Sequence, residues 1–180
     1  MNGEKAGTHL GCFTSGNFDI SDFVKNNGRN DLIVRIGSHP GALPDWAPSG
    51  SDYEKPKWTP GIYDDVSIIT SSYPFIENVQ VAPDIYDSTI IVQSRVVNKG
   101  EPKALKLSYS IEGFKFDFMT TDNDMEAILI NENDTILVLD TIQIPEARLW
   151  SPEEPNLYKL KVSTGGDDLS TRFGMREFKF

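Results

Sequence analysis

The feature of this chain that most limits its fold is an alternation of apolar and polar residues with a period of two. The clearest case is the segment ALKLSYSI at residues 104–111, in which every second residue is apolar. The same pattern recurs in LIVRI at residues 32–36 and in YKLKV at residues 158–162. Side chains of a β-strand point alternately to its two faces, so this period is typical of strands that bury one face. Three further segments, STIIVQSRVV, TILVLDTIQI and STRFGMREFKF, are similarly rich in β-branched or aromatic residues. The pattern predicts an all-β protein.

The predicted strands are unevenly distributed along the chain. Residues 39–60 contain five prolines and two tryptophans but no alternation, and so long a segment without regular structure is usually functional or disordered. We expect residues 61–71 (GIYDDVSIITS) to return to a strand, and SYPF at residues 72–75 has the composition of a short linker. About seven strands follow from Phe75 at spacings typical of a sandwich. We therefore predict a boundary between residues 71 and 72, with an immunoglobulin-like β-sandwich in residues 72–180.

Charge and cysteine content exclude several classes of function. The formal net charge is −10 and the sequence pI is about 4.6, with no cluster of Lys or Arg. We therefore expect neither nucleic acid nor an anionic membrane as a partner, because both require concentrated positive charge. The net charge does not argue against neutral ligands such as sugars. Cys12 is the sole cysteine, so no intrachain disulfide and no cysteine-based zinc site can form.

We expect no metal and no other cofactor. The segment TDNDMEA at residues 121–127 places acids at alternate positions but lacks the glycine and the downstream acid of an EF-hand loop. A solvated turn is the favoured interpretation of this segment. No apolar stretch approaches the roughly 20 residues needed to span a bilayer, and the N-terminal residues lack the apolar core of a signal peptide.

The segment LWSPEEPNLYKL at residues 149–160 combines two prolines with bulky apolar residues. Pro152 and Pro155 fix φ and remove two amide donors, so the chain cannot extend a strand ladder there. We predict a packing corner in which Leu149 and Trp150 are buried against the edge of the sandwich before the next strand begins.

Four motifs, in this order, resemble glycoside hydrolase family 2. The first segment, residues 2–24, is similar to a pattern of the family's sugar-binding jelly roll: Asn-Gly, a strand of small residues, and then Phe-x-Phe-Asp-Ile-Thr. The segment GRNDLIVRI that follows resembles the family's G-x-N-x-L-x-V-x-V strand. The second, WTPGIYDDVSI at residues 58–68, resembles the segment that closes that domain. The third, LWSPEEPNLYKLKV, resembles a corner of the immunoglobulin-like domain that follows, and the fourth, FGMREFKF, resembles the strand that leads into the catalytic barrel.

The resemblance implies a non-catalytic accessory or scaffold region of an exo-acting β-glycosidase. Residues 1–71 would be the C-terminal part of a sugar-binding, galactose-binding-like jelly roll, and residues 72–180 the immunoglobulin-like domain. The expected partner is a catalytic (β/α)₈ barrel after residue 180, and the remaining jelly-roll strands are expected before Asn2. No segment resembles the family's acid/base or nucleophile, so we expect no catalytic residue in this chain.

The resemblance leaves the sugar and linkage preference of the parent enzyme open among galactosides, mannosides and glucuronides. A bacterial periplasmic or secreted location of the parent is the expectation. Unpaired strand edges in a partial jelly roll predict self-association as a homodimer.

The candidates for direct substrate contact are Asp45, Trp46 and Trp58. An aromatic ring can stack on the C–H face of a pyranose, and a carboxylate accepts hydrogen bonds from its hydroxyls. Interdomain packing is the favoured alternative for these residues, because buried aromatics usually pack. Two functions of other classes remain: a stand-alone carbohydrate-binding protein, and a cell-surface adhesion module, which predicts internal repeats that the sequence lacks.

Overall fold

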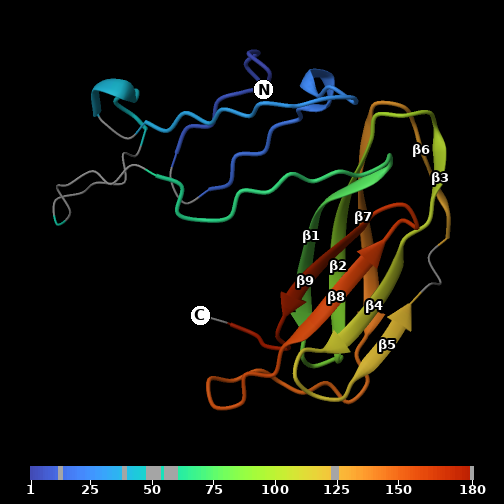
Figure 1. Cartoon of the computed structure of the whole chain (residues 1–180). Helices are drawn as coiled ribbons and strands as arrows, with labels where there is room; N and C mark the ends of the chain where they lie inside the picture. Colours follow the sequence, from blue (N-terminus) through green and yellow to red (C-terminus); the bar gives the residue numbers. More distant parts are fainter. Residues whose placement is uncertain (12–13, 38–39, 48–53, 55–60, 123–125, 179–180) are drawn as a thin grey trace. The chain divides into compact units, whose positions relative to one another are not determined.

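The structure is a computed structural model that describes residues 1–11, 14–37, 40–47, 54, 61–122 and 126–178 (Figure 1). The chain divides into two compact units, residues 1–68 and residues 69–180. The division lies close to the predicted domain boundary at residues 71 and 72, which stays a prediction about the domains of the protein.

The described residues of the first unit contain turns and two short 3₁₀ helices, η1 (Ser21–Phe23) and η2 (Pro40–Ala42), but no β-strand. Asn2 and Gly3 form a turn: both residues have positive φ, 49° and 88°, and the Glu4 amide donates to the Met1 carbonyl at 2.9 Å. This is the combination that Asn-Gly adopts readily. The Asn2 side chain then donates to the Phe23 carbonyl at 2.7 Å and to the Asn30 side chain at 2.8 Å.

Two strand predictions in residues 1–71 are wrong. Residues 32–36 and 61–71 have no strand hydrogen bonds, and their side chains are exposed on both faces of the alternating pattern. Ile33 and Ile69, for example, are each 82% exposed. The physical reason is that a strand requires a hydrogen-bonded neighbour, and the described part of the chain supplies none to these segments. Alternation gives a segment the capacity to be a half-buried strand but does not provide its partner.

The second unit contains every strand that the structure describes (Figure 1). The strands are β1 (Phe75–Asp84), β2 (Thr89–Asn98), β3 (Lys103–Leu105), β4 (Ser108–Gly113), β5 (Met119–Asp122), β6 (Ile128–Ile130), β7 (Asp134–Gln143), β8 (Tyr158–Ser163) and β9 (Asp168–Phe173). They form a sheet of order β1-β2-β7, a sheet of order β5-β4-β8-β9, and a small pair, β3-β6. All pairings within these sheets are antiparallel.

The predicted fold class, an all-β protein with a β-sandwich, is confirmed. Figure 1 shows the four-stranded sheet lying across the face of the three-stranded sheet. The apolar core lies between them and draws on both sheets, and its fully buried members are Ile90, Leu105, Leu107, Ile111, Ile130, Ile144, Tyr158, Leu160, Met175, Val92, Val96 and Val162. The alternating segments therefore bury the apolar face that the sequence predicts.

Two of the predicted strands are interrupted. The segment at residues 104–111 splits after Leu105, because its first part pairs with β6 and its second part with β5 and β8. The last predicted strand ends at Phe173 rather than continuing to residue 180. Beyond it the pairing partner changes: Met175 forms an isolated parallel bridge with Leu149, and its carbonyl accepts from the Trp150 amide at 2.9 Å.

Candidate functional site

The predicted substrate-binding residues are only partly described by the structure. Asp45 and Trp46 are exposed, and Trp46 leaves 71% of its surface accessible, while Trp58 lies outside the described residues. The local geometry explains the orientation of Trp46: the Ala47 amide donates to the Pro44 carbonyl at 2.9 Å, and Ala47 is buried. This turn directs the indole of Trp46 into solvent, where it can contact a ligand or another protein surface. Sugar contact by these residues stays a prediction.

The start of β8 forms the best-defined arrangement of the sandwich. The Tyr158 side chain is fully buried, and its hydroxyl accepts a hydrogen bond from the Arg148 amide at 2.7 Å and faces the Arg148 carbonyl at 3.4 Å. A tyrosine at the start of the penultimate strand that bonds the backbone of the preceding connection is a feature of immunoglobulin-like sandwiches. The bond fixes residues 144–157, which cross from one sheet to the other.

Aromatic rings surround Tyr158. Phe116 and Phe118 meet it edge to face at centroid distances of 5.0 and 5.2 Å, and Phe173 stacks on it at 5.3 Å. Burial among these rings raises the pKa of the Tyr158 hydroxyl above its usual value, although the backbone bond and the charge of Arg148 act in the opposite direction. The arrangement is a packing device with a satisfied polar group.

The proline corner at residues 149–156 differs in part from the prediction. Leu149, expected to be buried, is 52% exposed, and Trp150 is only half-buried. Backbone hydrogen bonds hold this corner, and of the two side chains only Trp150 packs on the chain after β9. The Trp150 amide donates to the Met175 carbonyl, the Trp150 side chain lies against Gly174, and the side chain of Asn156 donates to the Leu149 carbonyl at 3.0 Å. The central carbon of the Arg176 guanidinium lies over the Trp150 indole, 4.8 Å from the centre of its ring.

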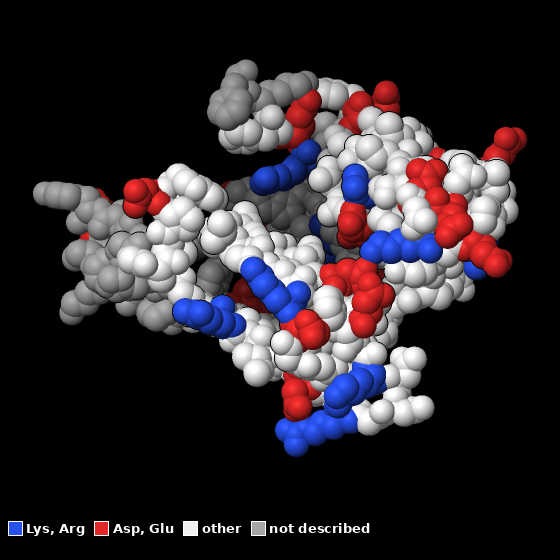
Figure 2. Space-filling model, turned by 90° about the horizontal axis from the view of Figure 1, so that it is seen from above, with Lys and Arg blue, Asp and Glu red and all other residues white. Residues whose placement is uncertain are grey.

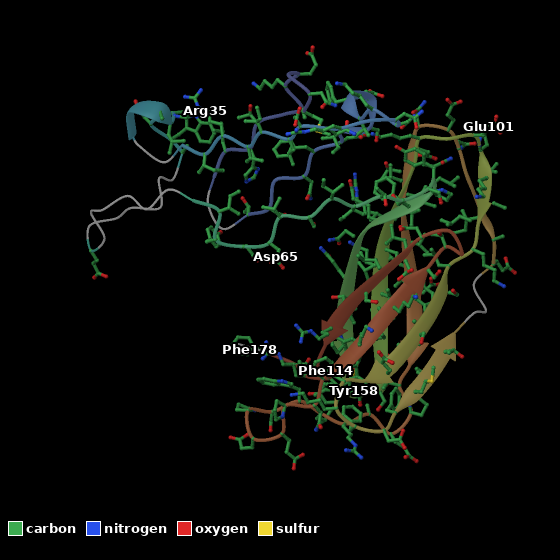
Figure 3. The ribbon with its side chains drawn as sticks, in the orientation of Figure 1. Arg35, Asp65, Glu101, Phe114, Tyr158 and Phe178 are labelled. Carbon is green, nitrogen blue, oxygen red and sulfur yellow. The ribbon has the colours of Figure 1, made fainter. Side chains whose placement is uncertain are left out.

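Cationic side chains lie over aromatic rings at this end of the sandwich. Arg148 lies 4.9 Å from the Phe116 ring, and Arg172 lies 5.1 Å from the Phe114 ring. Figure 3 shows Phe114 and Tyr158 at this same end, and the Phe114 amide donates to the Leu157 carbonyl at 2.8 Å. Such contacts order long side chains that would otherwise be mobile.

A row of charged residues crosses the outer face of the four-stranded sheet. Glu112 pairs with Lys159 across β4 and β8, and Lys159 pairs with Arg172 across β8 and β9. The Lys159 ammonium lies 3.2 Å from the Glu112 carboxylate. Next to this row is a hollow of about 330 Å³ lined by Phe114, Lys159, Ser170, Thr171 and Arg172.

Other kinds of site find no support in the part of the chain that the structure describes. No group of three or more His, Cys, Asp or Glu side chains there is placed to hold a metal ion. The acidic segment at residues 121–127 lies partly outside the described residues. On the face seen in Figure 2, Lys and Arg side chains lie among Asp and Glu side chains and form no continuous basic surface. Among the described residues no helix has the length and hydrophobicity needed to cross a bilayer.

The sequence analysis predicted neither the row formed by Glu112, Lys159 and Arg172 nor the hollow beside it. The alternation places Lys159 on the outer face of its strand, but it does not show which residue of β9 lies opposite. That information resides in the register, in which Lys159 faces Arg172 and Lys161 faces Ser170. The signal available was the pair of alternating segments on either side of STGGDD, whose turn fixes the register.

Comparisons with known proteins agree with the architecture. The model of the family described as Glycosyl hydrolases family 2 matches residues 75–176. A putative beta-glucuronidase of Formosa agariphila is 28% identical over the whole of this chain, which covers 21% of that protein. A beta-galactosidase of Clostridium acetobutylicum is 26% identical over 99% of this chain and 19% of its own length. The chain thus spans about a fifth of the length of these relatives.

A GH2 beta-galacturonidase from Eisenbergiella tayi matches with a TM-score of 0.46 and 22% identity, covering 61% of this chain and 19% of its own.

Proposed function

Because the chain belongs to glycosyl hydrolases family 2, we propose that it is a non-catalytic accessory region of an exo-acting β-glycosidase. Its sandwich would hold other domains of the parent enzyme in a fixed arrangement, and the reaction itself would occur in a (β/α)₈ barrel elsewhere in that enzyme. The observation that carries this proposal is the coverage: relatives named for glycosidase activity match the whole of this chain with about a fifth of their own length.

The arrangement of the sandwich is consistent with a scaffold. Hydrolysis of a glycosidic bond needs two carboxyl groups about 5 to 10 Å apart across the bond. The distinctive side chains of this sandwich are instead packing devices: the buried Tyr158, its surrounding rings, and the corner at residues 149–156 tied to the end of β9. A domain whose ends are held in this way can keep neighbouring domains at a fixed distance and orientation.

The decisive experiment is to sequence the native gene on both sides of this coding segment. The proposal expects the reading frame to continue into a (β/α)₈ pattern with two glutamates at the ends of barrel strands. In parallel, the 180-residue chain should release no nitrophenol from p-nitrophenyl β-glucuronide, β-galactoside or β-mannoside above the buffer rate. A stop codon directly after residue 180, or turnover by the chain alone, would refute the proposal.

A stand-alone carbohydrate-binding protein is the second candidate, and the exposure of Trp46 favours it. This function requires sugar-dependent quenching of tryptophan fluorescence that is lost in Trp46→Ala. Trp150→Phe serves as the matched control, because that indole is half-buried beneath Arg176. Equal quenching in both variants would refute a role for Trp46 in binding sugar.

A further inference from the structure

Two positive charges lie directly opposite each other on the outer face of the sandwich. Lys159 of β8 and Arg172 of β9 are register partners, and both point away from the core, because Tyr158 and Phe173 beside them are buried. Like charges in this position on an antiparallel pair repel and are destabilising. The pairing is unexpected in a chain with 27 acidic and 17 basic residues.

The neighbouring row of the same sheet shows how such a charge is normally compensated. Lys161 lies 3.3 Å from the Asp168 carboxylate, and its register partner on β9 is the neutral Ser170. Asp168 lies two residues from Ser170 along β9, so the acid that compensates Lys161 comes from an adjacent register position. In the row of Lys159 and Arg172, Glu112 is the single acid for two bases, and it pairs with Lys159. Arg172 has no carboxylate partner among the residues that the structure describes.

The unpaired guanidinium is held in place by an aromatic ring. Its central carbon lies 5.1 Å from the centre of the Phe114 ring. A cation ordered in this way loses less conformational entropy when it binds an anion, so the site is partly preorganised. The planar fork of Arg172 matches the two oxygens of a carboxylate.

The hollow beside this row has room for one small molecule. Its volume is about 330 Å³ and it is open to solvent, so it would hold a ligand of monosaccharide size at the surface rather than enclose it. Ser170 lends a hydroxyl to the lining, and Phe114 provides an apolar wall. A hydroxylated ligand can therefore find hydrogen-bond partners next to the cations.

We propose that this hollow binds a hydroxylated carboxylic acid of monosaccharide size, with its carboxylate between Arg172 and Lys159. The ligand carboxylate compensates the second positive charge of the row. Its hydroxyls lie against Ser170, and its C–H groups lie against Phe114. The site lies wholly within the sandwich and does not depend on the parent enzyme being a glycosidase.

The test is a titration of the ¹⁵N-labelled 180-residue chain with sodium glucuronate at constant ionic strength, followed by amide chemical shifts. We expect saturable shifts at residues 159 and 170–172, with a dissociation constant of about 1 mM because the site is open to solvent. Arg172→Gln should weaken binding about tenfold, the usual effect of losing a hydrogen bond to a charged group. Arg172→Lys keeps the charge without the fork and should weaken binding to an intermediate degree.

Lys161→Gln is the matched control. Lys161 lies on β8, on the same face as Lys159, but its ammonium already has the Asp168 carboxylate as a partner. This variant should leave the dissociation constant unchanged. Equal weakening by Lys161→Gln and Arg172→Gln, or no saturable shifts near residue 172, would overturn the proposal. Glucose and acetate separate the sources of affinity: glucose should not bind, and acetate should bind at least about tenfold more weakly than glucuronate. Acetate that binds as tightly as glucuronate would overturn the assignment of a sugar-sized ligand.

Discussion

The side chain of Asn98, at the end of β2, is the buried polar group whose replacement we expect to damage the sandwich most. It is 1% exposed, and its amide nitrogen lies 3.0 to 3.2 Å from the carbonyl oxygens of Gly100, Glu101 and Asn131. Its oxygen accepts from the Gly100 amide at 3.1 Å. The side chain thus joins the connection after β2 to the connection before β7. Asn98→Ala leaves these backbone groups without a partner and should lower the free energy of unfolding by about 2 to 4 kcal/mol.

Asn98→Asp makes a sharper test, because it changes the charge but hardly the shape. The new carboxyl would present oxygen to three carbonyl oxygens in a buried site, so its folded-state pKa should be raised above the unfolded value of about 3.9. A group of this kind is neutral in the folded state at pH values where the unfolded chain is already ionised. The unfolded state then binds fewer protons, so the free energy of unfolding falls as pH rises, by about 1.4 kcal/mol per pH unit until the folded-state pKa is passed.

The measurement is urea unfolding followed by far-ultraviolet circular dichroism, at half-unit steps from pH 4.5 to 7.5. This signal reports the sandwich, because every strand that the structure describes lies in residues 69–180. The difference between native protein and Asn98→Asp should grow with pH, while the difference between native protein and Asn98→Ala should stay constant. A constant difference for Asn98→Asp would refute the placement of its side chain against carbonyl oxygens.

Three further predictions concern other parts of the chain. Tyr158→Phe should lower the free energy of unfolding by about 1 to 2 kcal/mol at pH 7, because the Arg148 amide loses its acceptor. The pKa of Tyr158 is raised in the folded state, so above pH about 10 its hydroxyl ionises in the unfolded chain before it ionises in the folded protein. The free energy of unfolding of the native protein should therefore fall as pH rises through this range, and that of Tyr158→Phe should fall less. Ser94→Ala should be neutral or stabilising by up to about 1 kcal/mol in thermal unfolding, because the buried Ser94 hydroxyl has no hydrogen-bond partner among the described residues. The chain should be dimeric by light scattering at high concentration, and a monomeric mass there would contradict the expected self-association.

The alternation of apolar and polar residues predicts the sandwich well, because each strand there has neighbours that satisfy its backbone. Residues 158–162 and 135–144 form strands where the pattern places them, with β8 and β7 observed at Tyr158–Ser163 and Asp134–Gln143. Residues 32–36, which were predicted to be a strand on the same grounds, form none. The difference is not local: it resides in whether another segment is available to complete the hydrogen-bond ladder.

The proposed carboxylate site shows a second limit of the sequence. Phe114, Lys159 and Arg172 come from three segments, and each alone is an ordinary surface residue. They become a site only through the register of β4, β8 and β9, which a shift of one residue would destroy. The substrate-binding candidates Asp45, Trp46 and Trp58 depend instead on residue type and on the family resemblance. The structure adds that Asp45 and Trp46 are exposed, and Trp58 lies outside the described residues.

The contrast in burial between the two units bears on how each achieves stability. The apolar core contains only residues of the second unit, from Ile76 to Met175, and the family model covers nearly the same range. In the described part of the first unit Ala47 alone is buried, while Ile33, Val66 and Ile68 leave more than half of their surface accessible. Apolar side chains stabilise a fold only when their surface is removed from water. The sandwich can therefore be stable through its own residues, whereas the exposed apolar side chains in the described part of residues 1–68 stabilise that unit little while they remain in water.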